Sequence, residues 1–171
     1  MNRSAVGNMV VIGALAGLVG GVAEVIWICI YATLTDTDAA LVARAVTQAF
    51  EFGGQAPKSA VGGIGIHMAL AAMLGIAIAF ALRTTGRIRH GIGMYTFVIA
   101  VLAIVWAVNI LVVLPIVSPQ FVKVVPYGVS FLSKLFFGIA AAWFYQLADF
   151  AATPPDPGFA SPHRERTGDV P

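Results

Sequence analysis

The chain has 171 residues, of which 59% are hydrophobic and only 11% are charged, and its mean hydropathy is +0.89. Soluble globular chains average about 25% charged residues, so this composition excludes an ordinary soluble domain and indicates an integral membrane protein whose solvent is lipid. The single cysteine, Cys29, excludes a disulfide scaffold. Ten Lys and Arg against eight Asp and Glu lack the basic excess that favours binding to nucleic acid.

Four stretches are long and apolar enough to cross a bilayer. A helix needs about 20 mainly apolar residues to cross the roughly 30 Å hydrocarbon core, because each backbone N–H and C=O must find its partner within the segment. The stretches that meet this requirement are approximately residues 9–34, 60–82, 91–117 and 127–147. We therefore predict an all-α fold in which residues 1–150 form one four-helix transmembrane domain.

The first stretch has two interpretations. Arg3, the apolar run after it and Gly21-Val22-Ala23 are together similar to a signal peptide with a small-x-small cleavage site. The apolar run, however, continues to Tyr31, which makes it long enough to span the bilayer. We favour a span.

The connection after the first stretch predicts a short amphipathic helix on the outer side. Its apolar residues recur at helical spacing and are Leu41, Val42, Ala45, Val46, Ala49 and Phe50. Thr35 or Asp36 is suited to cap the start of this helix, and Gly53-Gly54 is suited to end it. Such a helix either rests in the membrane interface or folds over the mouth of the bundle as a lid.

The basic residues outside the predicted spans are unevenly distributed. Most precede the first stretch, follow the second or lie in the C-terminal tail, and these are Arg3, Arg83, Arg87, Arg89, Arg164 and Arg166. Only Arg44, Lys58 and Lys123 lie in the first and third connections. Because basic loops are retained in the cytoplasm, we expect both termini to be cytoplasmic.

The C-terminal segment differs in composition from the rest of the chain. From residue 151 it soon becomes rich in proline and in polar residues. Such a composition cannot bury enough apolar surface to fold, so we predict that residues 151–171 form a disordered cytoplasmic tail.

Each predicted span carries a polar or charged side chain at a similar depth. In helices that alternate in direction and rise about 1.5 Å per residue, these side chains lie roughly 10 to 15 Å below the outer surface. They are Glu24, His67, Asn109 and Lys134. Charged groups in hydrocarbon cost about 2.5 to 3.5 kcal/mol each to insert, and they usually face a protein interior. We therefore predict an intramembrane polar cluster.

Small residues indicate which helix faces pack together, because they allow two backbones to approach closely. The glycines predicted to pack in this way are Gly13, Gly17, Gly21, Gly63, Gly75 and Gly138. They share helix faces with Glu24, His67 and Lys134, which are therefore expected to point toward neighbouring helices. Asn109 instead shares its face with Trp106 and valines, which leaves its direction open.

The cluster has two interpretations. In the first, Glu24 and Lys134 form an internal ion pair, His67 and Asn109 satisfy the remaining donors and acceptors, and the cluster only fixes the register of the helices. In the second, the cluster is a proton or ligand site reached from outside. Glu24 and His67 would then be the titrating pair, and Lys134 would set the local field.

Other chemistries find less support in the sequence. A metal site needs about four ligands at suitable spacing, which is not the pattern of Cys29, Glu24, His67, Met68 and Met73. Haem between two intramembrane histidines is disfavoured, because only His67 lies in a span. The sequence has none of the motifs of serine hydrolases, zinc proteases, thiol redox enzymes or phosphate-binding loops. We predict no metal, no cofactor and no enzymatic activity.

The same residues resemble a known family. Gly17-Leu-Val-Gly-Gly-Val-Ala-Glu24, His67, Asn109 with Pro115, and Lys134-Leu-Phe-Phe-Gly138 are together similar to the YagU-like bacterial inner-membrane proteins. The resemblance implies a multi-pass protein of the bacterial inner (cytoplasmic) membrane. It carries over no functional residue.

Small size, glycine-lined helix faces and the lack of a catalytic motif predict an accessory or structural subunit of a membrane complex. It would contact the lipid bilayer, and its protein partners would be other membrane subunits or further copies of itself. We expect no nucleic acid among its partners. The alternative is a small oligomeric transporter or proton-conducting protein that uses the intramembrane Glu, His and Lys. An oligomer is expected there, because four helices leave little room for a substrate path within one protomer.

Overall fold

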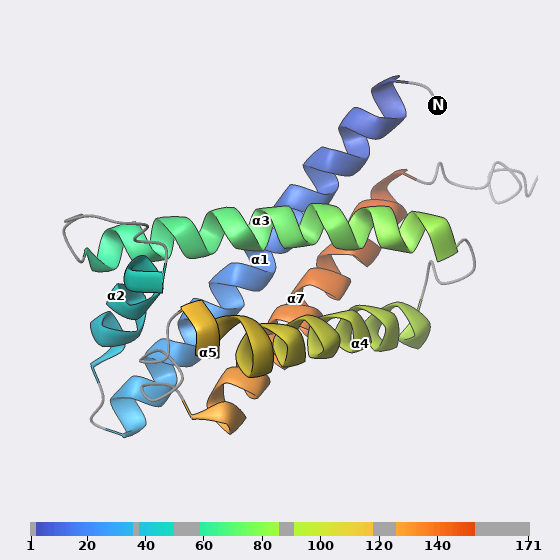
Figure 1. Cartoon of the computed structure of the whole chain (residues 1–171). Helices are drawn as coiled ribbons and strands as arrows, with labels where there is room; N and C mark the ends of the chain where they lie inside the picture. The colour runs from blue at the N-terminus through green and yellow to red at the C-terminus, as the bar shows by residue number, and fades with distance from the viewer. Residues whose placement is uncertain (1–2, 36–37, 50–58, 86–90, 118–125, 153–171) are drawn as a thin grey trace, which may run out of the picture.

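The computed structural model describes residues 3–35, 38–49, 59–85, 91–117 and 126–152, and this part of the chain is helical with no strand. Figure 1 shows the elements, which are α1 (Arg3–Leu34), α2 (Ala39–Ala49), α3 (Ala60–Thr85), α4 (Ile92–Val108), the π-helix η1 (Asn109–Val113), α5 (Leu114–Val117) and α7 (Tyr127–Ala152). The predicted all-α fold is confirmed.

Four segments are long and apolar enough to cross a membrane, and they are Val6–Leu34, Ala60–Thr84, Ile92–Ile116 and Tyr127–Ala148. They lie close to the four predicted stretches and fit a multi-pass membrane protein. The first helix is continuous through the Gly21-Val22-Ala23 segment, as a span requires. Of the predicted C-terminal tail, Ala151 and Ala152 belong to α7, and the rest lies outside the described residues.

The long helices pack in a defined order. α1 lies between α3 and α7, and α4 packs against α7. The N-terminal end of α1, the C-terminal end of α3 and the C-terminal end of α7 lie at the same end of the bundle (Figure 1). The largest fully buried side chains, Phe137, Ile78, Leu102 and Val98, come from α7, α3 and α4, so one hydrophobic core holds these helices together.

Glycines bring α1 and α3 into backbone contact. A Cβ atom on Gly17 would collide with the backbone oxygen of Ala71, and one on Gly75 would collide with the backbone oxygen of Gly13. A Cβ on Gly13 would lie 2.8 Å from the Cα of Ile76. Only glycine fits at these contacts, because the obstacle is backbone that cannot move aside.

The short helix α2 packs against the start of α3. Gly63 makes this contact possible, because a Cβ there would collide with the backbone oxygen of Ala43, and the Thr47 hydroxyl donates to the Ser59 backbone oxygen at 2.9 Å. The predicted caps of this helix were wrong at its start. Asp38 is the capping residue, and its Oδ1 accepts from the Ala40 N–H at 2.8 Å.

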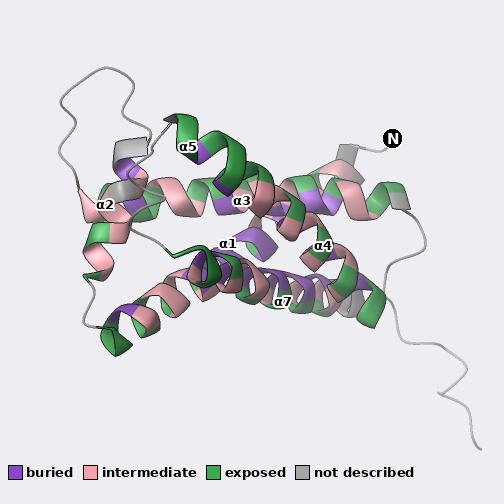
Figure 2. Cartoon of the chain, turned by 60° about the horizontal axis from the view of Figure 1, so that its bottom comes forward, coloured by how far each residue is buried: buried purple, intermediate pink, exposed green. Residues whose placement is uncertain are grey.

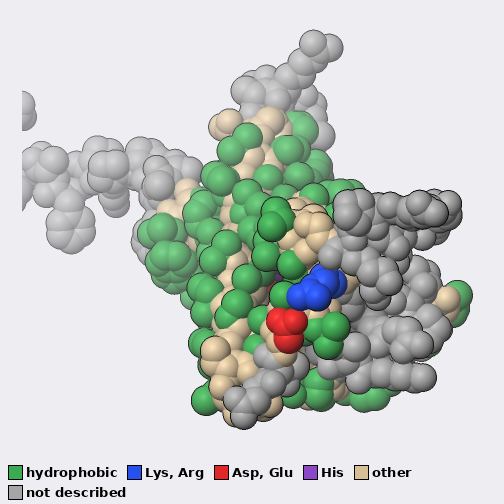
Figure 3. All heavy atoms as spheres, turned by 90° about the vertical axis from the view of Figure 1, so that its left-hand side faces the viewer, with side chains coloured by type: hydrophobic (Ala, Val, Ile, Leu, Met, Phe, Trp, Pro, Cys, Tyr) green, Lys and Arg blue, Asp and Glu red, His purple; other side chains and the backbone are tan. Residues whose placement is uncertain are grey.

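Asp38 is a better cap than Thr35 because it lies immediately before α2, where its carboxylate reaches the free N–H groups of the first turn. The Thr35 hydroxyl instead donates to the Tyr31 backbone oxygen at the end of α1. Asp36 and Gly53-Gly54 lie outside the described residues. Figure 3 shows the end of the molecule that carries α2, where the described surface is mainly hydrophobic and acidic and basic side chains meet at one place. An exposed ion pair of 3.2 Å joins Arg44 to Asp38.

The third span is irregular in its C-terminal half. Residues Asn109–Val113 form a π-helical turn in which the Leu114 N–H bonds to the Asn109 backbone oxygen. Pro115 follows directly, and in a regular α-helix its ring would collide with the carbonyl four residues earlier, while its nitrogen has no hydrogen to donate. The wider turn accommodates this proline without ending the helix.

Candidate functional site: an intramembrane polar cluster

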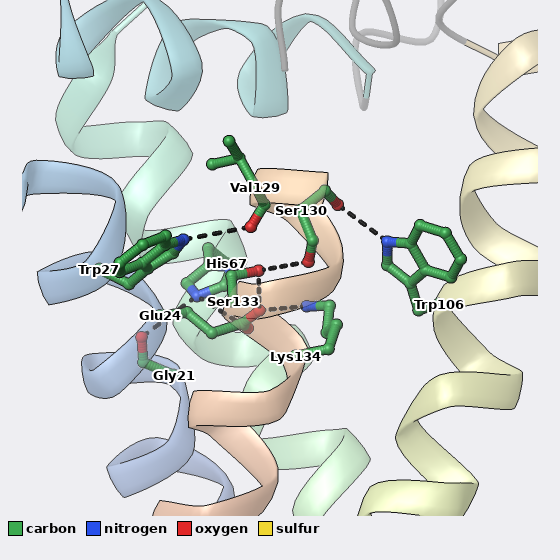
Figure 4. Close-up of polar contacts among 9 residues, drawn as sticks. All are labelled: Gly21, Glu24, Trp27, His67, Trp106, Val129, Ser130, Ser133 and Lys134. Carbon is green, nitrogen blue, oxygen red and sulfur yellow. Dashed lines mark hydrogen bonds and ion pairs between the residues drawn. The ribbon is translucent and has the colours of Figure 1, made fainter. Parts of the chain in front are cut away.

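The centre of the cluster is the carboxylate of Glu24, which comes from α1 and meets α7 (Figure 4). Glu24 is only 4% exposed. Its Oε1 lies 2.6 Å from the Nζ of Lys134 and 2.9 Å from the Oγ of Ser133. A buried carboxylate is tolerated only where opposite charge and hydrogen-bond donors replace water, and adjacent residues of α7 supply both.

His67 brings α3 into the same cluster. Its Nε2 lies 3.4 Å from the backbone oxygen of Gly21 and 3.7 Å from the Oε2 of Glu24. Both oxygens are acceptors when the carboxylate is ionised, so their arrangement assigns the ring hydrogen to Nε2. The second carboxylate oxygen of Glu24 therefore faces a donor from a third helix.

Ser130 and Trp106 extend the cluster toward α4, and Trp27 adds a further contact between α1 and α7 (Figure 4). The indole N–H of Trp106 donates to the Ser130 hydroxyl at 3.1 Å, and the indole N–H of Trp27 donates to the Val129 backbone oxygen at 3.1 Å. The Ser133 hydroxyl also lies 2.8 Å from the Ser130 backbone oxygen. It carries one hydrogen, so it donates either to that oxygen or to the carboxylate.

Close approach of α1 to its neighbours makes these contacts possible. A Cβ on Gly21 would lie 2.8 Å from the Ala71 Cβ on α3, and a Cβ on Gly20 would lie 2.8 Å from the ring of Phe137 on α7. Gly20 and Gly21 precede Glu24 by about one turn. They therefore set the distance across which Glu24 reaches both α3 and α7.

The structure brings together three of the four predicted cluster residues, and Asn109 lies apart from them. The row of α4, η1 and α5 that faces inward is Leu102, Trp106, Ile110 and Leu114, at four-residue intervals. Asn109 lies outside this row and is exposed, and in the described part of the chain no hydrogen bond reaches its side chain. The prediction that Asn109 belongs to the polar cluster was wrong for this reason.

The predicted packing glycines lie at three different helix interfaces. Gly13, Gly17, Gly21 and Gly75 lie between α1 and α3, whereas Gly63 contacts α2. Gly138 contacts α4, where a Cβ would lie 3.0 Å from side-chain atoms of Ile99 and Leu102.

Sequence reasoning missed Gly20, Ser133 and the hydrogen-bonding roles of Trp27 and Trp106. A buried indole N–H usually requires an acceptor. That requirement was the available signal for both tryptophans. Ser133 could have been found from its position next to Lys134.

The cluster offers ion pairing and proton exchange as its chemistry. Glu24 carries a negative charge, Lys134 a positive charge, and His67 an imidazole that changes charge near neutral pH in ordinary surroundings. Among the described residues, no group of three or more His, Cys, Asp or Glu could hold a metal ion.

Comparison with known proteins does not extend these observations. No protein-family model, curated protein or solved structure matches the chain. The resemblance to the YagU-like proteins therefore stays a prediction.

Proposed function

We propose that this protein is an accessory or structural subunit of a membrane complex and has no enzymatic activity. The observation that carries the proposal is the closed geometry of the Glu24 carboxylate, which has one oxygen on Lys134 and Ser133 and the other facing His67. In this proposal the cluster holds α1, α3 and α7 together, and the enclosed Glu24 carboxylate is not available to a substrate.

Burial supports a structural role for the cluster. Glu24 is almost completely enclosed, and glycine contacts on the same faces of α1 hold the helices at a fixed spacing. An ion pair enclosed in this way fixes the register of the helices, because sliding one helix by a residue would separate the charges in a medium of low dielectric constant. A rigid bundle is suited to presenting an outer surface to other subunits.

The second candidate is a small oligomeric transporter or proton-conducting protein. It is favoured by the partial exposure of two members of the cluster, since the side chains of His67 and Lys134 are 25% and 22% exposed. A proton that reaches the imidazole from that side would lie next to the carboxylate. In this candidate function, Glu24 and His67 would exchange the proton, and the positive charge of Lys134 would set the local electrostatic field.

We also propose that the protein lies in the bacterial inner membrane with both termini in the cytoplasm. Arg83 lies in the last turn of α3, at the end of the bundle that also holds the start of α1 and the end of α7 (Figure 1). In a Cys29→Ser background, a cysteine at the exposed Thr84 should react with an impermeant maleimide only after the membrane is opened. Labelling of this cysteine in intact cells would show that this end of the bundle lies outside the cytoplasm.

A proton-flux measurement separates the two candidate functions. The purified protein in liposomes under an imposed pH gradient should give no flux beyond that of liposomes without protein. A pH-dependent flux that Glu24→Gln abolishes would overturn the structural proposal and support proton conduction.

Purification tests the association with other subunits. Extraction from native membranes in mild detergent should recover the chain with a stoichiometric partner or as an oligomer. Recovery only as a monomer would contradict the accessory role.

A further inference from the structure

The outward face of the third span combines an exposed amide with a regular apolar row. The row is Ile104, Val108, Val112 and Ile116, at four-residue intervals, and these side chains are between 51% and 77% exposed. Asn109 lies beside this row at the start of η1 and is exposed as well. Figure 2 shows that the end of this span, at α5, is mainly exposed.

An amide at this place has no solvent that can replace a protein partner. Asn109 lies inside the span Ile92–Ile116, where the surroundings of an exposed side chain are lipid tails that offer no hydrogen bonds. In the described part of the chain its side chain has no hydrogen bond. Asn side chains in membrane spans hydrogen-bond across helix contacts, so the exposed position of Asn109 indicates a face that another span covers.

We propose that a second copy of this chain docks on this face, with the two Asn109 side chains forming a reciprocal pair of hydrogen bonds across a twofold axis. One amide has both a donor and an acceptor, so an identical amide in the opposite orientation satisfies both groups. The contact is isologous, because each copy presents the same surface to the other.

The rest of the face fits the same occupant. The span Ile92–Ile116 contains no charged residue, so two copies do not repel each other there, and a charged partner would find no counter-charge. The apolar row consists of valine and isoleucine, whose branched side chains have few rotamers to lose on packing. Two such rows can pack with little entropic cost beside the amide pair.

This proposal goes beyond the proposed function and does not rest on it, because an accessory subunit and a transporter could each form the dimer. Cross-linking in native membranes tests it directly. In a Cys29→Ser background, Val112→Cys should give a disulfide-linked dimer on mild oxidation. The matched control is Ile30→Cys on α1, which is similarly exposed and lies a similar distance from the outer end of its helix, and it should not cross-link.

The role of the amide is tested in the same background by energy transfer between labelled copies in vesicles. Asn109→Leu should raise the dissociation constant of the dimer about eightfold, the effect of two hydrogen bonds of the average strength measured between membrane helices. Asn109→Gln, which keeps the amide, should restore much of the affinity. Thermal unfolding of the monomer in detergent confirms that each variant folds.

Three results would overturn the proposal. The first is equal cross-linking of Val112→Cys and Ile30→Cys, or none of either. The second is cross-linking of Val112→Cys to a different protein, which would assign the face to a heterologous subunit. The third is an unchanged dissociation constant for Asn109→Leu.

Discussion

Two regions of the bundle each contain a polar side chain within a span, but they differ in whether that side chain is buried and hydrogen-bonded. Where α1 meets α3 and α7, Glu24 is buried and its oxygens face donors from two other helices. In the C-terminal half of the third span, Asn109 is exposed and no hydrogen bond within the described residues reaches its side chain. The difference lies in the neighbouring residues, because Gly20 and Gly21 admit other helices near Glu24, while valines surround Asn109.

The comparison teaches that small neighbours indicate the direction of a polar residue in a span. Glycine permits close helix contact, and a polar group beside it finds interhelical partners. Asn109 instead lies among β-branched valines and is exposed.

Breaking the buried ion pair should have the largest effect. Lys134→Met leaves the Glu24 carboxylate uncompensated in a medium of low dielectric constant, so the free energy of unfolding should fall by about 3 to 5 kcal/mol. Arg44→Met is the matched control, because it breaks the exposed pair with Asp38 and should cost at most about 1 kcal/mol. Denaturant titration in detergent micelles measures both. Similar losses in the two variants would show that burial does not distinguish the pairs.

The glycine contact between α1 and α3 should be next in size. Gly17→Ala places a Cβ against the backbone oxygen of Ala71 and should destabilise the bundle by about 1 to 3 kcal/mol, the usual cost of overpacking. Gly65→Ala makes the same change on α3, where nothing lies within 4 Å, and should be neutral or stabilise the helix by up to about 1 kcal/mol. The same titration compares them. A neutral Gly17→Ala would contradict the close contact.

A single tryptophan hydrogen bond should have a smaller effect. Trp27→Phe removes the bond to the Val129 backbone oxygen and keeps an aromatic ring near Phe136, so the loss should be about 0.6 to 1.7 kcal/mol, the range measured for interhelical bonds in membranes. Trp143→Phe changes an exposed indole of α7 and serves as the control. Equal losses would mean that the Trp27 bond contributes nothing.

The smallest expected effect is at Asn109. Because this side chain makes no hydrogen bond within the described part of the chain, Asn109→Leu should change the free energy of unfolding of the monomer by no more than about 0.5 kcal/mol. Ser133→Ala is the comparison from the other region, since it removes a buried hydroxyl that donates to Glu24 or to the Ser130 backbone oxygen and should cost more. A large loss for Asn109→Leu would place that residue in the bundle interior.

Much of the fold was predictable because long apolar stretches have few alternatives in lipid. The backbone must be satisfied within each segment, so hydropathy alone gives the spans, and helical spacing of the apolar residues from Leu41 onward predicts α2. The cap of α2 was harder to predict from the sequence. Thr35, Asp36 and Asp38 are all suitable caps by residue type, and only the geometry selects Asp38. The π-helical turn before Pro115 was not predicted, since a proline permits several distortions.

The candidate site was predictable in part for the same reason. Glycine rows placed Glu24, His67 and Lys134 on packed faces, and alternation of the helices placed them at one depth. The direction of Asn109 depends on which row of α4 faces α7, and depth alone does not determine that. Ser133 and the tryptophans contribute through hydrogen bonds to particular atoms, which spacing in the sequence does not specify.

The pairing of Glu24 with Lys134 is tested most directly by a double-mutant cycle on the free energy of unfolding. Lys134→Met and Glu24→Gln should each destabilise the bundle, and the double variant should recover much of the loss, because it contains no uncompensated charge. The coupling energy should then exceed about 1 kcal/mol, within the range seen for residues in direct contact. Additive losses in the double variant would show that Glu24 and Lys134 do not pair, and would contradict the proposal that this ion pair holds the helices together.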